Sequence, residues 1–249
     1  MPDLPLAPPT IPAVEVSRLD FRYKGDERLV LRDLSLTVQP GARCLLIGAN
    51  GAGKTTLLAI LGGRHMVAQE RVRVLGQPAF HDTSLVARVA YVGGAFPFEV
   101  DCPVRDILAG QPPHDPERLE LLLEVLGVDV NWRMHRVSDG QRRRVQILLH
   151  LLLPRELLLL DEVTTDLDLV ARSNLLRFLR RDGESRGATI LYATHILDGL
   201  DDWATHIAFM DGGRIRLFDE LANVRELRDL REAHVSSPLY RLVERWLRD

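Results

Sequence analysis

The sequence predicts an α/β fold in which a mainly parallel β-sheet is covered by helices. Buried apolar strands alternate with helical stretches along the second half of the chain, and a glycine-rich loop joins an earlier strand to a helix. The chain has 249 residues, which suits one sizeable domain with a small insertion. The strands are expected at residues 43–47, 157–160, 189–193 and 207–210, and the helices at 54–61, 169–181 and 196–203.

The N-terminal region predicts an antiparallel β layer in front of this sheet. Strand-like runs at residues 14–16, 19–23 and 34–38 are separated by a charged turn around residues 24–26. Residues 1–12 are rich in proline and lack the basic region and apolar core of a signal peptide, so a disordered lead is expected rather than secretion.

Composition excludes several classes of protein. Charged residues make up 27% and the net charge is −3, which gives no electrostatic basis for a general binder of nucleic acid or membrane surfaces. Cys44 and Cys102 form no C-x-x-C pair and are interpreted as reduced packing residues. The apolar run at 147–153 contains His150 and is far shorter than the roughly 20 residues of a membrane span, so a cytoplasmic protein is predicted.

Residues 48–55, G-A-N-G-A-G-K-T, match the phosphate-loop pattern G-x-x-x-x-G-K-[ST] between a strand and a helix. The glycines allow backbone N–H groups to turn toward phosphates, and the helix N-terminus favours an anion. Lys54 is placed to reach the β and γ phosphates of ATP, and the Thr55 hydroxyl to ligate Mg²⁺. The predicted nucleotide-binding residues here are Asn50, Gly51, Ala52, Gly53, Lys54, Thr55 and Thr56.

An apolar strand at residues 157–160 ends in two acids, Asp161 and Glu162. Asp161 is predicted to join the Mg²⁺ shell, and Glu162 to act as the general base or to orient the attacking water. Taken alone, two acids after a leucine run are more typical of a strand-end turn.

The region between these two motifs predicts a helical subdomain at about residues 95–153. Helices are expected at 104–108, at 117–126 and from near Ser138. At the other end of the chain, residues 219–249 predict an extension of two amphipathic helices broken at 236–238. That extension is either a partner surface or a cap on the core.

The segment 137–141, V-S-D-G-Q, begins the basic helix of the predicted subdomain. Ser138 is a good N-cap and Gln141 follows three residues later, a capping-box pattern at a helix start that favours an anion. An isolated segment of this kind is only a cap. Here it lies between the phosphate loop and the acidic strand, and this order resembles the signature motif of the ATP-binding cassette (ABC) family of P-loop NTPases.

The resemblance to ABC nucleotide-binding domains runs over residues 14–215, and it implies a domain at 13–218. It implies that Ser138, Gly140 and Gln141 hold the γ-phosphate of ATP bound to a second subunit, in a homodimer or a heterodimer with another ABC domain. Tyr23 resembles the aromatic residue that stacks on adenine, and residues 165–168 resemble the D-loop. His195 resembles the switch histidine that contacts the γ-phosphate and the attacking water.

Two positions depart from the ABC pattern. Gly94 stands where most members have a glutamine that contacts Mg²⁺ and the attacking water. Asp139 replaces the first glycine of the signature, and its carboxylate is expected to turn away from a bound anion toward Arg142 or Arg143.

Three segments, at residues 132–147, 160–168 and 192–200, resemble more closely the soluble ABC ATPases associated with the Ccr–Not deadenylase complex in fungi and the plant non-intrinsic ABC proteins. That group lacks fused membrane domains and tends to lack the loop glutamine. The resemblance implies a soluble ATPase that drives a conformational cycle in a soluble partner.

Two alternatives stay open: the ATP-binding subunit of a transporter with separate permease chains, and an ATP-dependent regulatory scaffold with little turnover. The basic run at residues 142–144 suggests nucleic-acid binding, but it lies beside an acid-rich site and no specific nucleic acid is predicted.

Overall fold

The computed structural model describes residues 10–94 and 101–248, and their strands form two sheets. Residues 1–9 of the expected disordered lead lie outside the described residues. The first sheet is antiparallel, in the order β2 (Leu31–Val38), β1 (Val14–Phe21), β4 (Val72–Val74) and β5 (Gln77–Pro78). The second has the order β10 (Arg214–Glu220), β9 (His206–Asp211), β3 (Arg43–Gly48), β8 (Thr189–Ala193), β7 (Leu157–Asp161) and β6 (Val89–Val92).

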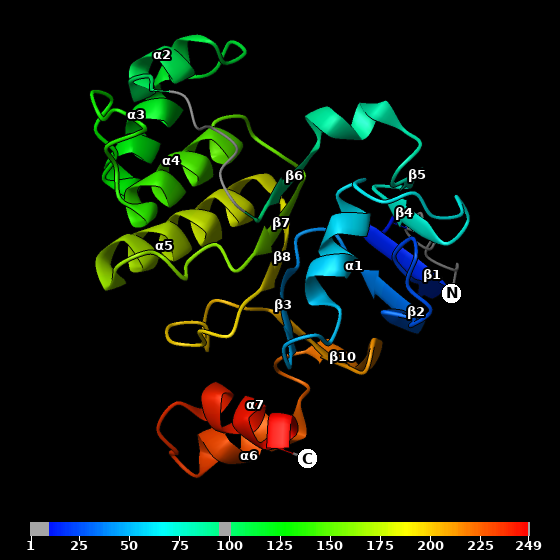
Figure 1. Cartoon of the computed structure of the whole chain (residues 1–249). Coiled ribbons are helices and arrows are strands. Elements are labelled where there is room, and N and C mark those ends of the chain that lie inside the picture. The colour runs from blue at the N-terminus through cyan, green and yellow to red at the C-terminus, as the bar shows by residue number, and fades with distance from the viewer. Residues whose placement is uncertain (1–9, 95–100, 249) are drawn as a thin grey trace, which may run out of the picture.

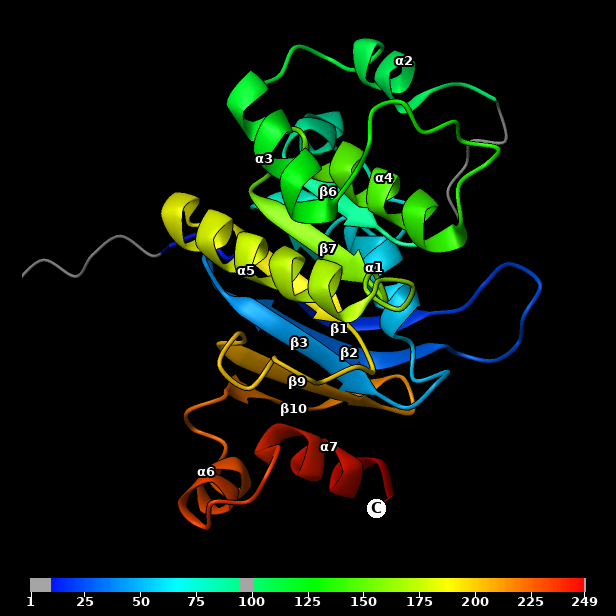
Figure 2. The same ribbon diagram turned by 90° about the vertical axis from the view of Figure 1, so that its left-hand side faces the viewer.

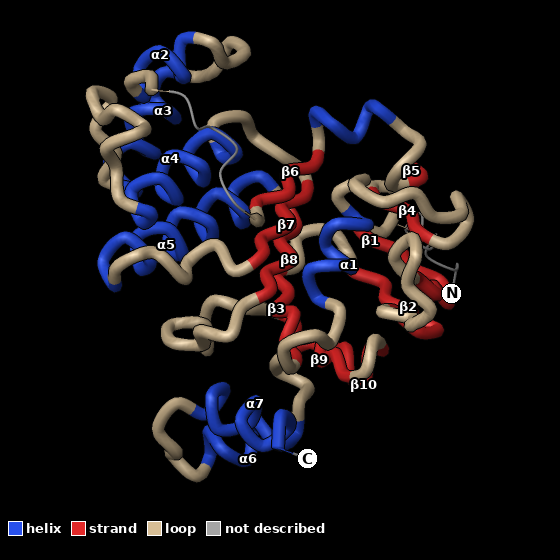
Figure 3. The backbone as a smooth tube through the Cα atoms, viewed as in Figure 1, coloured by secondary structure: helices blue, strands red, loops and turns tan. Residues whose placement is uncertain are grey.

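The second sheet is parallel from β9 to β6, and β10 pairs with β9 antiparallel. It separates two hydrophobic cores, and Figure 3 shows its strands running in one layer through the middle of the molecule. The α/β fold with an antiparallel β layer, expected from the sequence, is confirmed.

Helices cover both faces of the parallel sheet (Figure 1). The antiparallel sheet and α1 enclose one core, and α3, α4 and α5 lie on the opposite face over the other. A 3₁₀ helix, η1, leads into β6. The helical bounds are α1 (Lys54–Leu61), η1 (Thr83–Ala87), α2 (Val104–Ala109), α3 (Pro116–Leu126), α4 (Asp139–Leu151), α5 (Leu169–Arg186), α6 (Arg225–Glu232) and α7 (Pro238–Arg248).

The C-terminal helices α6 and α7 pack beside the β9–β10 edge of the sheet (Figure 2). Leu227, Leu239 and Leu242 are fully buried in the same core as α4 and α5. The ring of Trp246 lies 5.2 Å from that of Phe209 on β9. These contacts agree with the expectation of two amphipathic helices and support the interpretation of a cap on the core.

The prediction of separate strands at 14–16 and 19–23 is wrong, because β1 is continuous from Val14 to Phe21. The polar residues between them form a bulge: pairing with β2 shifts register between Val16 and Leu19, and Arg18 has φ +42°. The N–H of Arg18 donates to Ser35 Oγ, which replaces a ladder bond at the bulge. Tyr23 therefore lies in the loop after β1.

The expected helix at 196–203 is not formed, and the segment is a series of turns. Gly199 has φ +74°, outside the helical region. The guanidinium of Arg172, on α5, donates to the carbonyls of Ile196 and Asp198 at 2.9 and 2.7 Å. A tertiary contact thus binds the carbonyls that a helix would have used in its own ladder.

Candidate nucleotide and hydrolysis site

The phosphate loop, residues 48–55, connects β3 to α1 and exposes the N-terminus of α1. Gly53 occupies the N-cap position with φ +105°, and no side chain caps the helix. This positive φ requires glycine, and a Cβ at Gly53 would in addition lie 2.7 Å from Leu31 Cδ2. Uncapped N–H groups at a helix start form an anion-binding site.

Lys54 folds back over the loop that precedes it. Its Nζ donates to the carbonyls of Gly48 and Ala49 at 2.7 and 3.1 Å. Burial lowers the pKa of Lys54, while the charges of Glu162 and Asp161 act in the opposite direction. The Lys54 ammonium therefore lies close enough to both acids to be stabilised by their negative charge.

Thr55 and Asp161 place two oxygen atoms that can ligate a metal side by side next to the phosphate loop. Thr55 Oγ1 donates to Asp161 Oδ1 at 3.2 Å, and the Asp161 residue is only 6% exposed. A hydroxyl and a carboxylate are hard oxygen ligands of the kind that Mg²⁺ uses beside phosphates. This donor set fits the predicted metal.

Tyr91, on β6, binds Asp161, and the sequence did not single it out as a site residue. Its hydroxyl donates to Asp161 Oδ2 at 3.0 Å, and the guanidinium carbon of Arg64 lies 4.1 Å from the centre of its ring. Burial first, and then the charge of Asp161, raises the pKa of Tyr91 to about 12, so the phenol stays a donor. The signal available in the sequence was a tyrosine two residues before the loop at Gly93 and Gly94.

Glu162 and His195 lie at the ends of the neighbouring strands β7 and β8. His195 Nδ1 is 3.0 Å from Glu162 Oε2, and the backbone N–H of His195 is 3.4 Å from the same oxygen. Glu162 adopts φ +51°, which is uncommon for a non-glycine residue, and its N–H donates to the carbonyl of Ala193 at 2.9 Å. The fold thus brings together a carboxylate and an imidazole predicted from separate motifs.

Tyr23 contacts α1, the helix that follows the phosphate loop. Its hydroxyl is 2.9 Å from Thr56 Oγ1, and its ring packs edge-on against Phe21 and His65. The side chain remains accessible, with 39% of the residue exposed. An exposed aromatic face next to the phosphate loop suits the predicted contact with a base.

The signature segment forms the capping box that its sequence predicts. Ser138 Oγ accepts from the N–H of Gln141 at 3.3 Å, and Gln141 Oε1 accepts from the N–H of Ser138 at 2.9 Å. In the described part of the chain, no hydrogen bond or ion pair joins Ser138, Gly140 or Gln141 to the phosphate loop. One subunit thus gathers only part of the predicted site.

The arginine contacts expected for Asp139 are not found in the part of the chain that the structure describes, and its orientation relative to a bound anion stays a prediction. Asp139 is exposed, and among the described residues it makes no ion pair with Arg142 or Arg143. Both arginines are held by other groups, since Arg142 donates to the carbonyl of Met134 and Arg143 to that of Gly94.

The three arginines at the start of α4 point into the protein. Arg144 donates to the carbonyl of Leu126 and pairs with Asp168, and each of the three binds at least one backbone carbonyl. These guanidinium groups are thus bound to acceptors of the protein itself.

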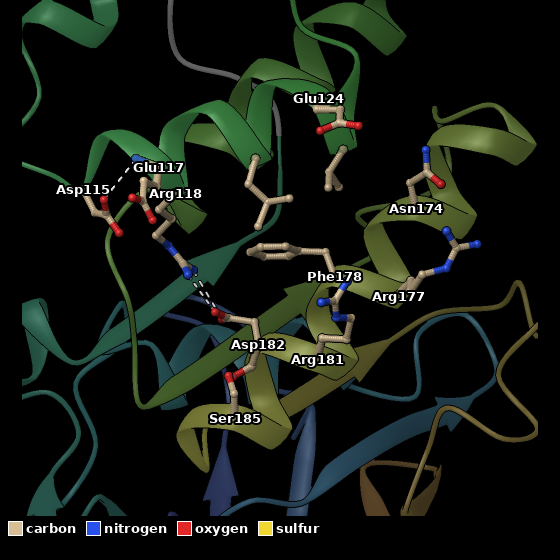
Figure 4. Close-up of a pocket in the computed structure, with 12 residues that line it drawn as sticks. Asp115, Glu117, Arg118, Glu124, Asn174, Arg177, Phe178, Arg181, Asp182 and Ser185 are labelled. Atoms are coloured by element: carbon tan, nitrogen blue, oxygen red, sulfur yellow. Dashed lines mark hydrogen bonds and ion pairs between the residues drawn. The ribbon is translucent and has the colours of Figure 1, made fainter.

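A cavity of about 670 Å³ lies between α3 and α5, and Figure 4 shows its lining. None of the predicted nucleotide-binding residues lines it. Its wall contains the ion pair of Arg118 with Asp182, which joins the two helices at 2.7 Å. This cavity is therefore separate from the phosphate-loop site.

Within residues 10–94 and 101–248, no helix has both the length and the apolar character to cross a membrane.

Comparison with protein families gives a match of residues 31–165 to the family described as ABC transporter. Among curated proteins, the chain is 46% identical to ABC transporter I family member 20 of Arabidopsis thaliana, over 94% of this chain and 76% of that protein. It is 46% identical to family member 21 of the same plant, over 95% and 86%. It is 38% identical to CCR4-associated factor 16 of Saccharomyces cerevisiae, over 82% and 77%.

Solved structures share the fold. A bacterial Atm1-family ABC exporter with ATP bound aligns with a TM-score of 0.76 at 23% identity, covering 97% of this chain and 43% of that one. A dimeric ATP-binding cassette in a post-hydrolysis state, bound to ADP and Pi, aligns with a TM-score of 0.68 at 21% identity, covering 84% and 98%.

Proposed function

The chain belongs to the ATP-binding cassette (ABC) family and carries its ATPase domain, and we propose that it hydrolyses ATP between two such domains to drive a conformational cycle in a soluble partner protein. ATP hydrolysis is the activity of this domain. What we propose in addition is which residues perform the hydrolysis, that it takes place in a dimer, and that it acts on a soluble partner. The observation that carries it is the contact of Glu162 with His195 beside Thr55 and Asp161.

Within one subunit, Lys54 and the N–H groups at the start of α1 bind the phosphates of ATP, and Tyr23 stacks on the base. Thr55 and Asp161 would hold Mg²⁺, which when bound would neutralise charge on the phosphates of ATP. Glu162 accepts the proton of the attacking water. His195 orients the Glu162 carboxylate through the 3.0 Å contact of its Nδ1.

The second subunit completes the site. Within the described residues, no hydrogen bond or ion pair joins Ser138, Gly140 or Gln141 to the phosphate loop of their own chain, yet they form a helix start that favours an anion. Two apolar residues at the start of α5, Leu169 and Val170, are 77% and 68% exposed next to the D-loop. Both features support a dimer, either homomeric or with another ABC domain, that closes on two MgATP molecules.

The domain proposed to do this spans residues 13–218, with the helical subdomain at about 95–153 and the extension at 219–249. A cytoplasmic location is part of the proposal. Cys44 and Cys102 are free thiols, as is usual in a reducing compartment.

The deciding experiment compares steady-state ATP hydrolysis by the wild type and Glu162→Gln, with ATP-dependent dimerisation measured by size-exclusion chromatography. We expect Glu162→Gln to lose at least about a hundredfold in kcat, because its side chain accepts no proton, and to accumulate as an ATP-bound dimer. Equal hydrolysis by the two proteins would refute the assignment of Glu162.

A partner can then be captured by affinity purification of the Glu162→Gln variant with ATP from the native cell. A soluble complex supports the proposal. Co-fractionation with a membrane permease supports instead the transporter subunit that the family description favours. A wild type that dimerises with ATP but scarcely turns over supports the regulatory scaffold, which the missing side chain at Gly94 favours.

A further inference from the structure

Arg143 contacts both the loop at Gly94 and the peptide of Glu162, and none of the sequence motifs accounts for these contacts. It lies in the second turn of α4, and its side chain is only 11% exposed. Nη1 donates to the carbonyl of Gly94 at 3.0 Å, and Nη2 donates to the carbonyl of Glu162 at 3.2 Å. The guanidinium therefore joins the helical subdomain to the loops that follow β6 and β7.

Two further contacts orient the guanidinium. Gln146, one turn along α4, accepts from Nη1 at 2.6 Å. Nε makes no hydrogen bond with the described residues and lies 4.0 Å from a carboxylate oxygen of Asp166 in the D-loop, within ion-pair distance. The planar guanidinium binds its several acceptors in fixed directions through the two Nη atoms. A lysine at this position offers a single ammonium group and cannot span these acceptors.

The neighbouring arginines serve as a comparison. Arg142 donates to the carbonyl of Met134 at 3.4 Å, and Arg144 reaches Leu126 and Asp168. Of these three side chains, only that of Arg143 contacts the peptide of Glu162. The contact with Glu162 therefore depends on the position of Arg143 on the helix.

The peptide of Glu162 needs such support. Its φ of +51° is unfavourable for a residue with a side chain, and conformations of this kind persist only where surrounding contacts hold them. The N–H of Glu162 is held by the carbonyl of Ala193, and its carbonyl by Arg143 and by the Thr165 hydroxyl at 3.2 Å. Because the carboxylate projects from this fixed peptide, its direction toward His195 depends on these contacts.

We propose that Arg143 is a positioning residue that fixes the Glu162 peptide and couples it to the helical subdomain and to the loop at Gly94. Gly94 has no side chain that could connect its loop to Glu162, whereas the Arg143 guanidinium binds the carbonyls of both residues. The inference rests on the proposed role of Glu162 as general base.

The test uses the full chain with Arg143→Gln, Arg143→Lys and the matched control Arg142→Gln. Steady-state hydrolysis is measured against ATP concentration, with circular dichroism to verify folding. We expect both Arg143 variants to lose at least about tenfold in kcat with KM for ATP changed less than about twofold, because a small misplacement of a catalytic group slows chemistry without weakening ATP binding.

The split between kcat and KM separates positioning from a general loss of structure. We expect kcat to fall with KM for ATP nearly unchanged in the Arg143 variants, and both constants to stay at the wild-type values in Arg142→Gln. If Arg143→Gln fails to fold, Arg143→Lys keeps the charge and the aliphatic stem and carries the test.

Wild-type kcat in the Arg143 variants would overturn the inference, and so would an equal loss of kcat in Arg142→Gln. The Glu162→Gln variant separates this failure from that of the proposed function. An active Glu162→Gln refutes the general base itself, whereas an inactive one beside normal Arg143 variants refutes only the role of Arg143.

Discussion

His195 Nδ1 lies 3.0 Å from Glu162 Oε2, across the ends of two adjacent parallel strands. The two residues are 33 positions apart in the sequence, and the register of β7 with β8, in which Asp161 is opposite Ala193, brings them together. An acid next to an imidazole at the carboxyl edge of a parallel sheet is an arrangement suited to proton transfer beside a bound nucleotide.

His195→Ala is expected to reduce kcat by about a hundredfold, because the Glu162 carboxylate loses the contact that orients it, while KM for ATP changes little. Steady-state kinetics measure both constants. His81→Ala is the control. His81 is exposed and lies just before η1, so this variant should match the wild type. An unchanged kcat in His195→Ala would contradict the assignment.

Tyr23 provides a test of base stacking. We expect Tyr23→Phe to keep wild-type affinity for ATP and Tyr23→Ala to lose about tenfold, since stacking of a base on an aromatic ring contributes ~1–3 kcal/mol. Isothermal titration calorimetry measures the affinity. An equal loss in both variants would assign the effect to the hydrogen bond of the hydroxyl with Thr56 instead.

Gly93 and Gly94 form a matched pair. A Cβ at Gly93 would lie 2.8 Å from Asp161 Cβ and 2.8 Å from the Tyr91 hydroxyl, whereas a Cβ at Gly94 meets nothing within 4 Å. Gly93→Ala is therefore expected to displace Asp161 and to abolish most hydrolysis. Gly94→Ala should cost only about 1–2 kcal/mol of stability through its φ of +71°. Hydrolysis assays and denaturant unfolding compare the two, and similar losses of activity would refute the role of the close approach.

The ion pair of Arg118 with Asp182 is expected to stabilise the helical subdomain. The two side chains are 11% and 9% exposed, and Arg186 also binds Asp182. Asp182→Asn leaves the nearly buried guanidinium of Arg118 without a counter-charge, so it should lower the free energy of unfolding by about 3–5 kcal/mol at pH 7. Glu244→Gln, which breaks pairs of exposed arginines on α7, should cost less than about 1 kcal/mol.

The same pair predicts a pH dependence. Burial would raise the pKa of Asp182, but hydrogen bonds from Arg186 and Arg118 outweigh it and lower the pKa below the ordinary 3.8. The stabilisation is therefore complete above about pH 4 and is lost as the pH falls through the lowered pKa. Unfolding curves of the wild type and Asp182→Asn should converge as the pH falls below 3.8. A constant difference between them would contradict this account.

Local features followed from adjacent residues in the sequence. The start of α1 at Lys54, the capping box of Ser138 with Gln141 and the break between α6 and α7 depend on side chains and backbone preferences within a few positions. Their physical causes lie inside the segment itself. The family resemblance then related these segments to one another, and the match to ABC proteins confirmed it.

Contacts between distant segments depended on the tertiary structure. The sequence shows neither the bulge at Arg18 nor the capture of the Ile196 carbonyl by Arg172, which prevents a helix there. It shows three arginines in a row but not that Arg143 is the one of them that reaches Glu162, because each residue turns about 100° around a helix and only packing sets which groups each side chain meets. The contact of Glu162 with His195 has the same origin: sequence supplied the two side chains, and the parallel sheet set them at one edge.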